Sequence, residues 1–172
     1  MEDIVIRRVE MTEVQMLQQV GRQSFDETFS PHNQRKHMDA YLSATFTEDK
    51  LKRELEDNRS QFFFALVNGV VAGYLKINTG EAQTELADDK GMEIERIYVL
   101  QCYQGKKIGY ALFQQALKIA RQLKMKYIWL GVWEHNAKAI NFYKKSGFVQ
   151  FEKHIFKLGP ISQTDLMMKL EL

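Results

Sequence analysis

The sequence feature that most constrains the fold is a strand pattern that leads through a glycine- and lysine-rich turn into an amphipathic helix. Residues 92–100, MEIERIYVL, are typical of a strand. The helix pattern in YQGKKIGYALFQQALKIA, residues 103–120, has apolar residues at helical spacing from Leu112 onward. A second strand pattern, YIWLGVW, occupies residues 127–133. Strands that alternate with helices in this way predict an α/β fold.

The rest of the chain contains one hairpin pattern and several short helix patterns. Residues 61–78 place apolar runs on both sides of Asn68-Gly69, a dipeptide that favours a two-residue hairpin turn. Further strands are expected at 4–9, 151–158 and 165–172, and further helices at 11–25, 31–46, 47–58 and 136–148. Thr12 and Gln15 have capping-box spacing in the first helix. The expected order is β-α-α-β-β-β-α-β-α-β-β, with room for a third short helix early in the chain.

Composition narrows the expected partners. The chain of 172 residues is predicted to form one domain, 1–172, and its formal net charge of +2 gives no bulk field that favours nucleic acid or an anionic membrane. Any anionic partner must therefore be held by a local site. Cys102 is the single cysteine, which excludes an internal disulfide. The N-terminus has no secretory pattern, and no apolar run approaches the ~20 residues that span a bilayer. A cytoplasmic protein is expected.

The turn before the helix at 108 has the composition of an anion site. A helix N-terminus offers unpaired N–H groups and a positive dipole end. Gly105 and Gly109 would let a diphosphate approach the backbone, and Lys106 and Lys107 add positive charge. The spacing matches neither the P-loop nor the dinucleotide pattern. On spacing alone, a solvated basic turn before an ordinary helix is an equal alternative.

Three segments together resemble the GNAT superfamily of N-acetyltransferases. QGKKIG, residues 104–109, resembles the R/Q-x-x-G-x-G/A loop that grips the pyrophosphate of acetyl-CoA, although Lys107 replaces the usual glycine. IERIYVLQCYQG resembles the family's fourth strand and its exit, and NAKAINFYKKSGF resembles the N-x-x-A-x-x-F-Y-x-K-x-G-F segment. SQFFF, IWLGVWE and QTDLMM extend the similarity to bacterial PaiA-type spermidine/spermine acetyltransferases. The resemblance implies a mixed, mostly antiparallel sheet flanked by helices.

The same resemblance implies a set of residues that bind acetyl-CoA as co-substrate. The backbone of Ile97, Tyr98 and Val99 would pair with the pantetheine arm, and the Ile97 region would supply an oxyanion donor. The remaining cofactor-binding candidates are Gln104, Gly105, Lys106, Lys107, Ile108, Gly109, Tyr110, Asn136 and Lys145. Lys145 has the alternative role of a solvated lysine at a helix C-terminus.

Acetyl transfer to an amine requires a neutral nucleophile and benefits from a proton on the leaving thiolate. Tyr143 is the candidate acid, because it lies two helical turns after Asn136 and so shares its face; the resemblance implies the same role. Glu95 is the candidate base, directly or through water, and a surface ion pair is its alternative. Strand alternation predicts that Glu93, Glu95 and Ile97 share one face.

The acceptor is predicted from acidic residues near this core. Residues 79–95 contain six acids and one lysine, and Asp26 and Glu27 add two more acids. Asp26, Glu27, Glu93 and Glu95 are the candidate substrate residues for a polyamine such as spermidine. A solvated acidic loop, another amine acceptor (an aminoglycoside, an amino acid or a protein amine) and a non-catalytic acetyl-CoA-binding regulatory module remain alternatives.

The remaining reactive side chains are expected to be structural. The four histidines lack metal-ligand spacing, so no metal is predicted. Cys102 is expected to be a buried or incidental thiol, and the tryptophans and Phe62–Phe64 are expected in the core. Strand edges that stay exposed could pair between two copies of the chain, which would form a homodimer.

Overall fold

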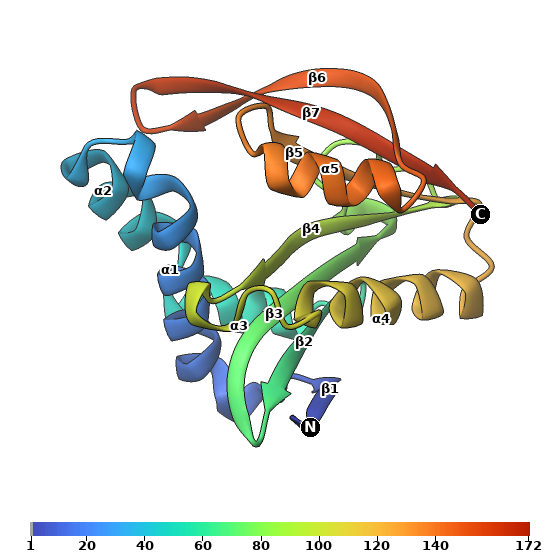
Figure 1. Ribbon diagram of the computed structural model, residues 1–172, viewed down its shortest axis with the longest axis horizontal. Helices are drawn as coiled ribbons and strands as arrows, with labels where there is room; N and C mark the ends of the chain where they lie inside the picture. Colours follow the sequence, from blue (N-terminus) through green and yellow to red (C-terminus); the bar gives the residue numbers. More distant parts are fainter. Residues whose placement is uncertain (1) are drawn as a thin grey trace.

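The computed structural model describes residues 2–172, and seven of its strands form one mixed sheet (Figure 1). The strands are β1 (Ile4–Arg8), β2 (Ser60–Val67), β3 (Val70–Thr79), β4 (Gly91–Val99), β5 (Tyr127–Trp133), β6 (Val149–Leu158) and β7 (Ile161–Glu171). Their spatial order is β1-β2-β3-β4-β5-β7-β6, and every neighbouring pair is antiparallel except β4–β5. The expected α/β fold with a mostly antiparallel sheet is confirmed.

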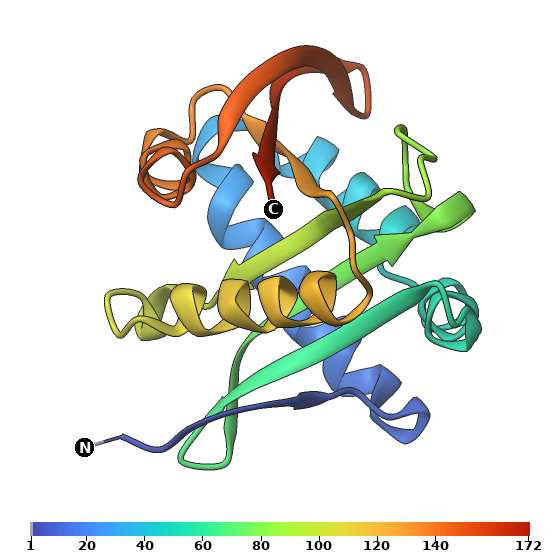
Figure 2. The same ribbon diagram turned by 90° about the vertical axis from the view of Figure 1, so that its right-hand side faces the viewer.

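Helices cover both faces of the sheet (Figures 1 and 2). The helices are α1 (Val14–Phe29), α2 (Arg35–Thr45), α3 (Glu48–Glu56), α4 (Ile108–Gln122) and α5 (Ala137–Lys145), and short 3₁₀ turns are η1 (Met11–Glu13), η2 (Ser30–His32), η3 (Gly80–Ala82) and η4 (Gln101–Tyr103). Helices α4 and α5 pack on one face around Leu112 and Ile94, whereas α1, α2 and α3 pack on the other. Helix α3 is the third short helix for which the predicted order left room early in the chain. None of the helices in residues 2–172 is both long and apolar enough to cross a membrane.

Local sequence explains most of these elements. Asn68 and Gly69 have φ angles of 49° and 82°, as a type I′ hairpin turn requires, so the predicted hairpin is confirmed. The predicted capping box at Thr12 is wrong. The backbone N–H of Glu10 instead donates to Glu13 (3.0 Å), whose carboxylate is held by Arg7 at 2.7 Å. The 3₁₀ turn η1 therefore precedes helix α1.

A β-bulge in β4 changes which side chains face which way. Lys76 pairs with Arg96 but the next residue of β3, Ile77, pairs with Ile94, so Glu95 is an extra residue. Glu95 and Arg96 both lie on the face of α1 and α3, and Ile97 packs with the α4 core. The prediction that Glu93, Glu95 and Ile97 share one face is therefore wrong for Ile97.

The parallel pair β4–β5 is short, and this opens the sheet. Residues Gly91–Ile94 of β4 pair with Tyr127–Leu130 of β5, and pairing stops there. Beyond that point β4 continues beside β3 and β5 continues beside β7, so the two strands diverge (Figure 1). The backbone edges that face each other across this split have no strand partner within residues 2–172.

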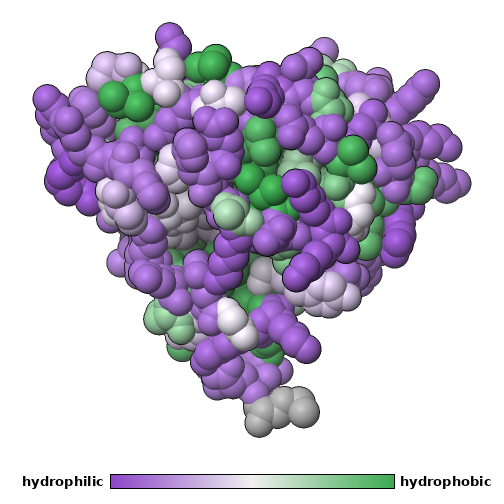
Figure 3. Space-filling model, turned by 45° about the horizontal axis from the view of Figure 1, so that its top comes forward, coloured by the Kyte–Doolittle hydropathy of each residue, from purple (hydrophilic) through white to green (hydrophobic). Residues whose placement is uncertain are grey.

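The far edge of the sheet is β6. Val149 and Ile155 on this strand are 68% and 61% exposed. The face of the molecule seen in Figure 3 is largely hydrophilic, with scattered hydrophobic side chains. An edge strand with exposed apolar side chains is a surface on which another chain can pair. The homodimer that the sequence left open stays a prediction.

Candidate active site

A pocket of about 1060 Å³ occupies the split between β4 and β5. One end, which we call the α4 end, is lined by the exit of β4, the turn before α4, and α5. The other end, which we call the aromatic end, is lined by α1, α2, α3, β6 and β7, together with the residues of β4 and β5 that face these helices. The two ends meet where the strands diverge.

The turn before α4 presents uncapped backbone to the pocket. Lys107 is the N-cap residue and adopts the left-handed conformation (φ 63°, ψ 20°), and no side chain caps the helix. Gly105 is also left-handed, with φ 82°. A Cβ added at Gly109 would meet only Val99 Cγ2, at 3.9 Å, so the backbone here stays open to a ligand. The first N–H groups of α4 are thus available to an anion.

Gln104 fastens this turn to its neighbours. Its amide donates to the Val99 carbonyl (3.2 Å) and accepts from Lys138 at the start of α5 (3.4 Å). Lys106 behaves differently from its neighbours, because its ammonium pairs with Glu2 at 2.7 Å and it does not line the pocket. Of the segment 104–110, all residues except Lys106 line the pocket.

Helix α5 brings Asn136 and Tyr143 to the same pocket. The Asn136 side chain accepts from the backbone N–H of Ala139 at 3.2 Å, which confirms it as the N-cap. The Tyr143 ring is buried between Phe142 and Phe148, with centroid distances of 5.6 and 5.5 Å. Burial raises the pKa of Tyr143 well above its ordinary value. Its hydroxyl therefore stays protonated near neutral pH and remains available as a hydrogen-bond donor.

Glu95 lies in a buried network of charges. Its carboxylate accepts from Lys76 Nζ at 2.9 Å and contacts Arg96 Nε at 3.1 Å, and Glu54 of α3 binds the same Lys76. Burial by itself would raise the pKa of Glu95, but Arg96 and Lys76 outweigh it and lower the pKa. A carboxylate held by two cations is a weak proton acceptor. Glu95 forms the ion pair that was its alternative role, but the pair is buried and does not lie at the surface. The role of Glu95 as base stays a prediction.

Glu93 is occupied by hydrogen bonds from neighbouring groups. It accepts from the backbone N–H of Thr84 (2.8 Å), from the Thr84 hydroxyl (2.5 Å) and from Asn78 (3.0 Å). Burial raises the pKa of Glu93. Glu93 lines the pocket, but its oxygens are largely satisfied by the protein.

Aromatic side chains form the walls of the aromatic end. They are Phe25, Phe29, Tyr41, Phe46, Trp133 and Phe156. Phe25 stacks on Tyr41 (4.7 Å between centroids), and Tyr41 meets Phe156 edge to face (5.7 Å). Trp133 was expected only in the core; it is buried but also lines the pocket. Phe62–Phe64 are core residues, as predicted.

Glu85, His154 and Asp165 form a second polar group at the aromatic end. His154 Nδ1 lies 3.2 Å from Glu85 Oε1, and His154 Nε2 lies 3.4 Å from Asp165 Oδ2. Gly131 makes room for them, because a Cβ there would come within 3.2 Å of the His154 ring. These residues were not among the candidates predicted from the sequence. The sequence signal that could have found them is a histidine, His154, and an acid, Asp165, in two successive predicted strands. Only the β6–β7 register places these two residues opposite each other.

Two predicted substrate residues do not reach the pocket. Asp26 pairs with Arg35 at 2.6 Å, and Glu27 accepts from the backbone N–H of Gln101 at 3.1 Å. Most of the acidic stretch is also elsewhere: Glu81 pairs with Arg59, and Asp88 accepts from the Tyr127 hydroxyl. Of the six acids in the stretch 79–95, only those at 85, 93 and 95 line the pocket.

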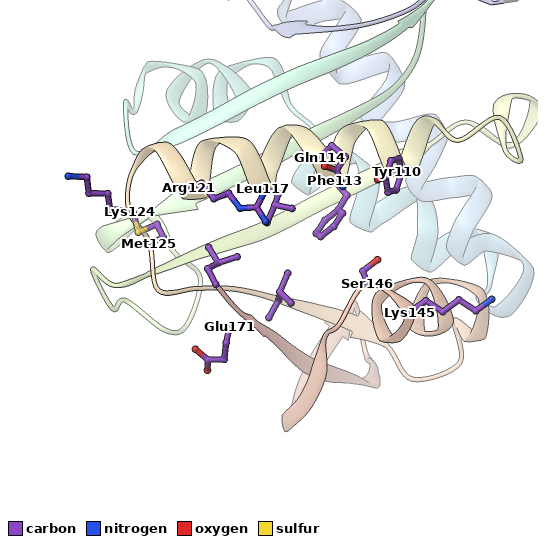
Figure 4. Close-up of a pocket in the computed structure, with 12 residues that line it drawn as sticks. Tyr110, Phe113, Gln114, Leu117, Arg121, Lys124, Met125, Lys145, Ser146 and Glu171 are labelled. Atoms are coloured by element: carbon purple, nitrogen blue, oxygen red, sulfur yellow. The ribbon is translucent and has the colours of Figure 1, made fainter.

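Two further residues lie away from the predicted positions. Lys145 lines a separate cavity of about 620 Å³ between α4 and the C-terminal strand, with Phe113, Leu117 and Leu170 (Figure 4). Its assignment to the cofactor stays a prediction that this placement does not support. Cys102 is exposed, so the first of its two expected roles, a buried thiol, is wrong, and it does not line the pocket.

Comparison with known proteins decides the family. The Acetyltransferase (GNAT) family model matches residues 22–148. The chain belongs to this family. An uncharacterized N-acetyltransferase from the pepI 3′ region of Lactobacillus delbrueckii subsp. lactis is 42% identical over 89% of this chain and 88% of its own length. The family assignment makes the chain an N-acetyltransferase.

Two more distant acetyltransferases are also similar to the chain. The spermidine N(1)-acetyltransferase of Thermoplasma acidophilum is 24% identical, with 84% of this chain and 88% of that protein covered. The crystal structure of the PaiA N-acetyltransferase of Thermoplasma acidophilum in complex with coenzyme A has a TM-score of 0.82 at 21% identity, with 99% of both chains covered. At that identity the structural match establishes the GNAT fold.

Proposed function

We propose that this GNAT enzyme transfers the acetyl group of acetyl-CoA to a primary amine of a polyamine, by direct attack in a ternary complex. The observation that carries the proposal is the separation of charge along one pocket. The α4 end offers helix N–H groups with Lys107 and Lys138, and the aromatic end offers carboxylates among aromatic rings. An anionic donor and a cationic acceptor would thus be drawn to opposite ends.

The α4 end suits acetyl-CoA. The diphosphate would bind at Gly105, Lys107, Ile108 and Gly109, where uncapped N–H groups and the helix dipole favour anions. The pantetheine arm would lie in the split and pair with the free edge of β4 near Ile97 and Val99. The thioester would then sit near the β4 bulge, where the two ends of the pocket meet.

Chemistry at that point needs donors to oxygen and sulfur. A backbone N–H of the bulged segment near Ile97 would stabilise the tetrahedral oxyanion. Tyr143 would donate its hydroxyl proton to the departing sulfur, and its raised pKa keeps that proton in place until then. Asn136 would hold the start of α5, so that Tyr143 keeps its position along the pocket.

The aromatic end suits a polyamine. The acids that line it are Glu54, Glu85, Glu93, Glu95 and Asp165, and the cations are Lys50 and Arg96. Excess carboxylate attracts ammonium groups, and the rings of Phe25, Tyr41 and Phe156 suit methylene segments and cation–π contacts. The similarity to the spermidine acetyltransferase supports the same substrate class. We expect this activity in the cytoplasm, where the exposed Cys102 would stay a thiol.

An amine panel tests this proposal. Release of free CoA should be measured with spermidine, spermine, a monoamine of similar length, an amino acid, an aminoglycoside and a peptide with a free N-terminus. We expect the highest kcat/KM for the polyamines. A tenfold higher kcat/KM for another class would overturn the polyamine assignment, and binding of acetyl-CoA without turnover of any amine would favour the regulatory alternative.

Salt provides an independent check on the acceptor. The kcat/KM for spermidine should fall as ionic strength rises toward about 1 M, because the Debye length shrinks to about 3 Å there. The monoamine carries less charge, so its kcat/KM should fall less. Equal salt dependence for both amines would remove the electrostatic argument for a polyamine.

A further inference from the structure

The proposed reaction raises a question of proton transfer. An alkylammonium has a pKa near ~10.4, so the acceptor must lose a proton before it can attack at neutral pH. Glu95 is held by Lys76 and Arg96, and Glu93 is held by Thr84 and Asn78. Neither carboxylate is well placed to take a proton and pass it to water. Another group should do so.

Asp165, His154 and Glu85 at the aromatic end lie next to one another and differ in how far they are exposed. Asp165 on β7 is 17% exposed at its side chain, His154 on β6 is 23% exposed, and Glu85 before β4 is 41% exposed. The ring of His154 lies between the two carboxylates, at 3.4 Å from Asp165 and 3.2 Å from Glu85. The exposed fraction therefore rises from Asp165 through His154 to Glu85. Within residues 2–172, His154 Nδ1 is buried and has no hydrogen-bond partner, so transfer to Glu85 across the 3.2 Å gap requires a small reorientation of one of the two side chains.

The inner end of this chain lies beside the split. Leu130 is the last residue of β5 that pairs with β4, and Gly131 follows it. A Cβ at Gly131 would be 3.4 Å from Asp165 Oδ2 and 3.2 Å from His154 Cε1. Because Gly131 has no side chain, Asp165 and His154 lie close to β5 at the place where the proposed thioester and amine would meet.

We infer that Asp165, His154 and Glu85 form the path by which the acceptor ammonium loses its proton to water. The inference rests on the proposed function, because it presumes an amine in this pocket. Asp165 is the residue that receives the proton, and His154 and Glu85 carry it outward. A histidine can take a proton at one nitrogen and release one from the other, which suits the middle position.

Protons and electron pairs balance along this path. One N–H bond of the ammonium breaks and Asp165 takes the proton, while the nitrogen keeps the electron pair. That pair forms the C–N bond to the thioester carbon, and the C–S bond breaks with its electrons on sulfur. The second proton lost by nitrogen reaches the sulfur through Tyr143. The proton on Asp165 leaves through His154 and Glu85 as the one proton released to water.

The electrostatics of the group are consistent with this role. Burial raises the pKa of Asp165 above its ordinary value of 3.8, although His154 opposes the rise. A carboxyl whose pKa is raised toward neutrality is a better proton acceptor than one at its ordinary value. Within residues 2–172, Glu85 and Asp165 are the charged groups in ion-pair reach of the His154 ring, and they face it from different elements.

Kinetics of matched variants test the inference. Asp165→Asn should lower kcat about 10²-fold near pH 7, the lower range for loss of a general base. The loss should shrink as the pH approaches the amine pKa of ~10.4, because the free amine needs no base. It should also shrink with a fluorinated analogue of the same amine, whose ammonium is more acidic. Acetyl-CoA affinity, measured by calorimetry, should stay unchanged.

Two further variants give the path its signature. His154→Gln should lower kcat with the same dependence on pH and amine acidity. The double variant Asp165→Asn/His154→Gln should be no slower than Asp165→Asn, because residues that act in one path are not additive. Glu81→Gln is the matched control: Glu81 is an acid of the same stretch that pairs with Arg59 outside the pocket, and kcat should not change.

Contrary results are distinguishable. If folded Asp165→Asn loses the same factor in kcat with the parent amine and its fluorinated analogue and at every pH, the proton path is wrong. A rise in KM without a change in kcat would contradict it too. In either case Asp165 would serve in substrate recognition or packing. A dependence on amine acidity in Glu95→Gln instead would assign the base to Glu95. If the wild-type enzyme prefers an amine other than a polyamine, the polyamine proposal is wrong, and the proton path is then tested with that preferred amine. If the wild-type enzyme acetylates no amine, both the polyamine proposal and the proton path are wrong.

Discussion

Single-residue conformation shapes the α4 end of the pocket. Lys107 adopts φ 63°, a region that side chains other than glycine enter at a cost of about 1–2 kcal/mol. The family loop resembled by residues 104–109 usually has glycine there. The chain thus accepts a strained residue that places a lysine at the N-cap of α4, beside the proposed diphosphate site.

Lys107→Gly should stabilise the fold and keep acetyl-CoA binding. Glycine adopts the left-handed conformation without strain, so we expect a gain of about 0.5–1 kcal/mol in the free energy of unfolding. Loss of one charge should raise the dissociation constant for acetyl-CoA by no more than about tenfold, or 1.4 kcal/mol. Urea denaturation and calorimetry measure the two effects. A loss of affinity by several tenfold steps would make Lys107 itself a principal phosphate ligand.

Tyr143→Phe should lower turnover and leave binding intact. The ring keeps its contacts with Phe142 and Phe148, and the hydroxyl is the only group removed. Loss of a general acid costs roughly 10²–10⁴-fold, and we expect the low end because a thiol pKa near ~8.5 makes CoA a fair leaving group. A thioester with a more acidic thiol should show a smaller defect. If folded Tyr143→Phe keeps the wild-type kcat, Tyr143 is not the acid and only contributes to packing.

At the scale of elements, the bulge in β4 and the start of α4 set the site. The bulge turns both Glu95 and Arg96 toward α3, where they join Lys76 and Glu54 in one buried network. It also turns Ile97 onto the α4 core. The short pairing of β4 with β5 then leaves the split in which the pocket lies.

Gly109→Val should damage acetyl-CoA binding more than folding. In the structure a Cβ at this position meets only Val99 Cγ2 at 3.9 Å, so the fold can accept a side chain. A β-branched residue would still block close approach of a diphosphate to the first turn of α4. Calorimetry should show the loss of affinity, and circular dichroism should show retained helix. Gly109→Ala is the matched control and should lose less.

Glu95→Gln should destabilise the fold. The change leaves Lys76 and Arg96 in a buried site with Glu54 as their remaining acid, and breaking a buried ion pair costs about 3–5 kcal/mol. Because Glu54 remains, we expect the low end of that range in urea unfolding. Glu81→Gln, at an exposed acid, should stay within about 0.5 kcal/mol of the wild type. A wild-type unfolding midpoint for Glu95→Gln would show that the network adds no net stability.

For the whole molecule, buried carboxylates set the response to acid. The pKa of Glu95 is lowered from its ordinary value of 4.5, so its contribution to stability is complete above about pH 4.5 and is lost as the pH falls through the lower, folded value. The pKa values of Glu93 and Asp165 are raised, so their unfavourable contributions are relieved as the pH falls from neutrality.

The melting temperature should therefore stay level or rise slightly from pH 7 to about 4.5 and then fall steeply. Calorimetric scans across this range measure it. Glu95→Gln should melt lower at pH 7 and show a shallower acid fall, because its amide does not titrate. An acid fall of equal steepness in both proteins would assign acid sensitivity to other carboxylates.

The sequence determined the parts of this protein that depend on local pattern. Apolar periodicity predicted the elements and their order, Asn68-Gly69 predicted its turn, and Asn136 predicted its helix cap, because each rests on neighbouring residues. The turn at 104–109 was predicted as an anion site, which stays a prediction, and all of its residues except Lys106 line the α4 end of the pocket. These features are set by backbone conformation within a few residues.

Tertiary structure decided which side chains line the aromatic end of the pocket. The bulge at Glu95, the pairing of Asp26 with Arg35, and the meeting of His154 with Asp165 all depend on contacts between distant segments. Strand register is the physical reason, because a shift of one residue moves each side chain to the other face of the sheet. The count of acids along the sequence predicted acids near the site, but only the folded sheet decides which of them line the aromatic end of the pocket.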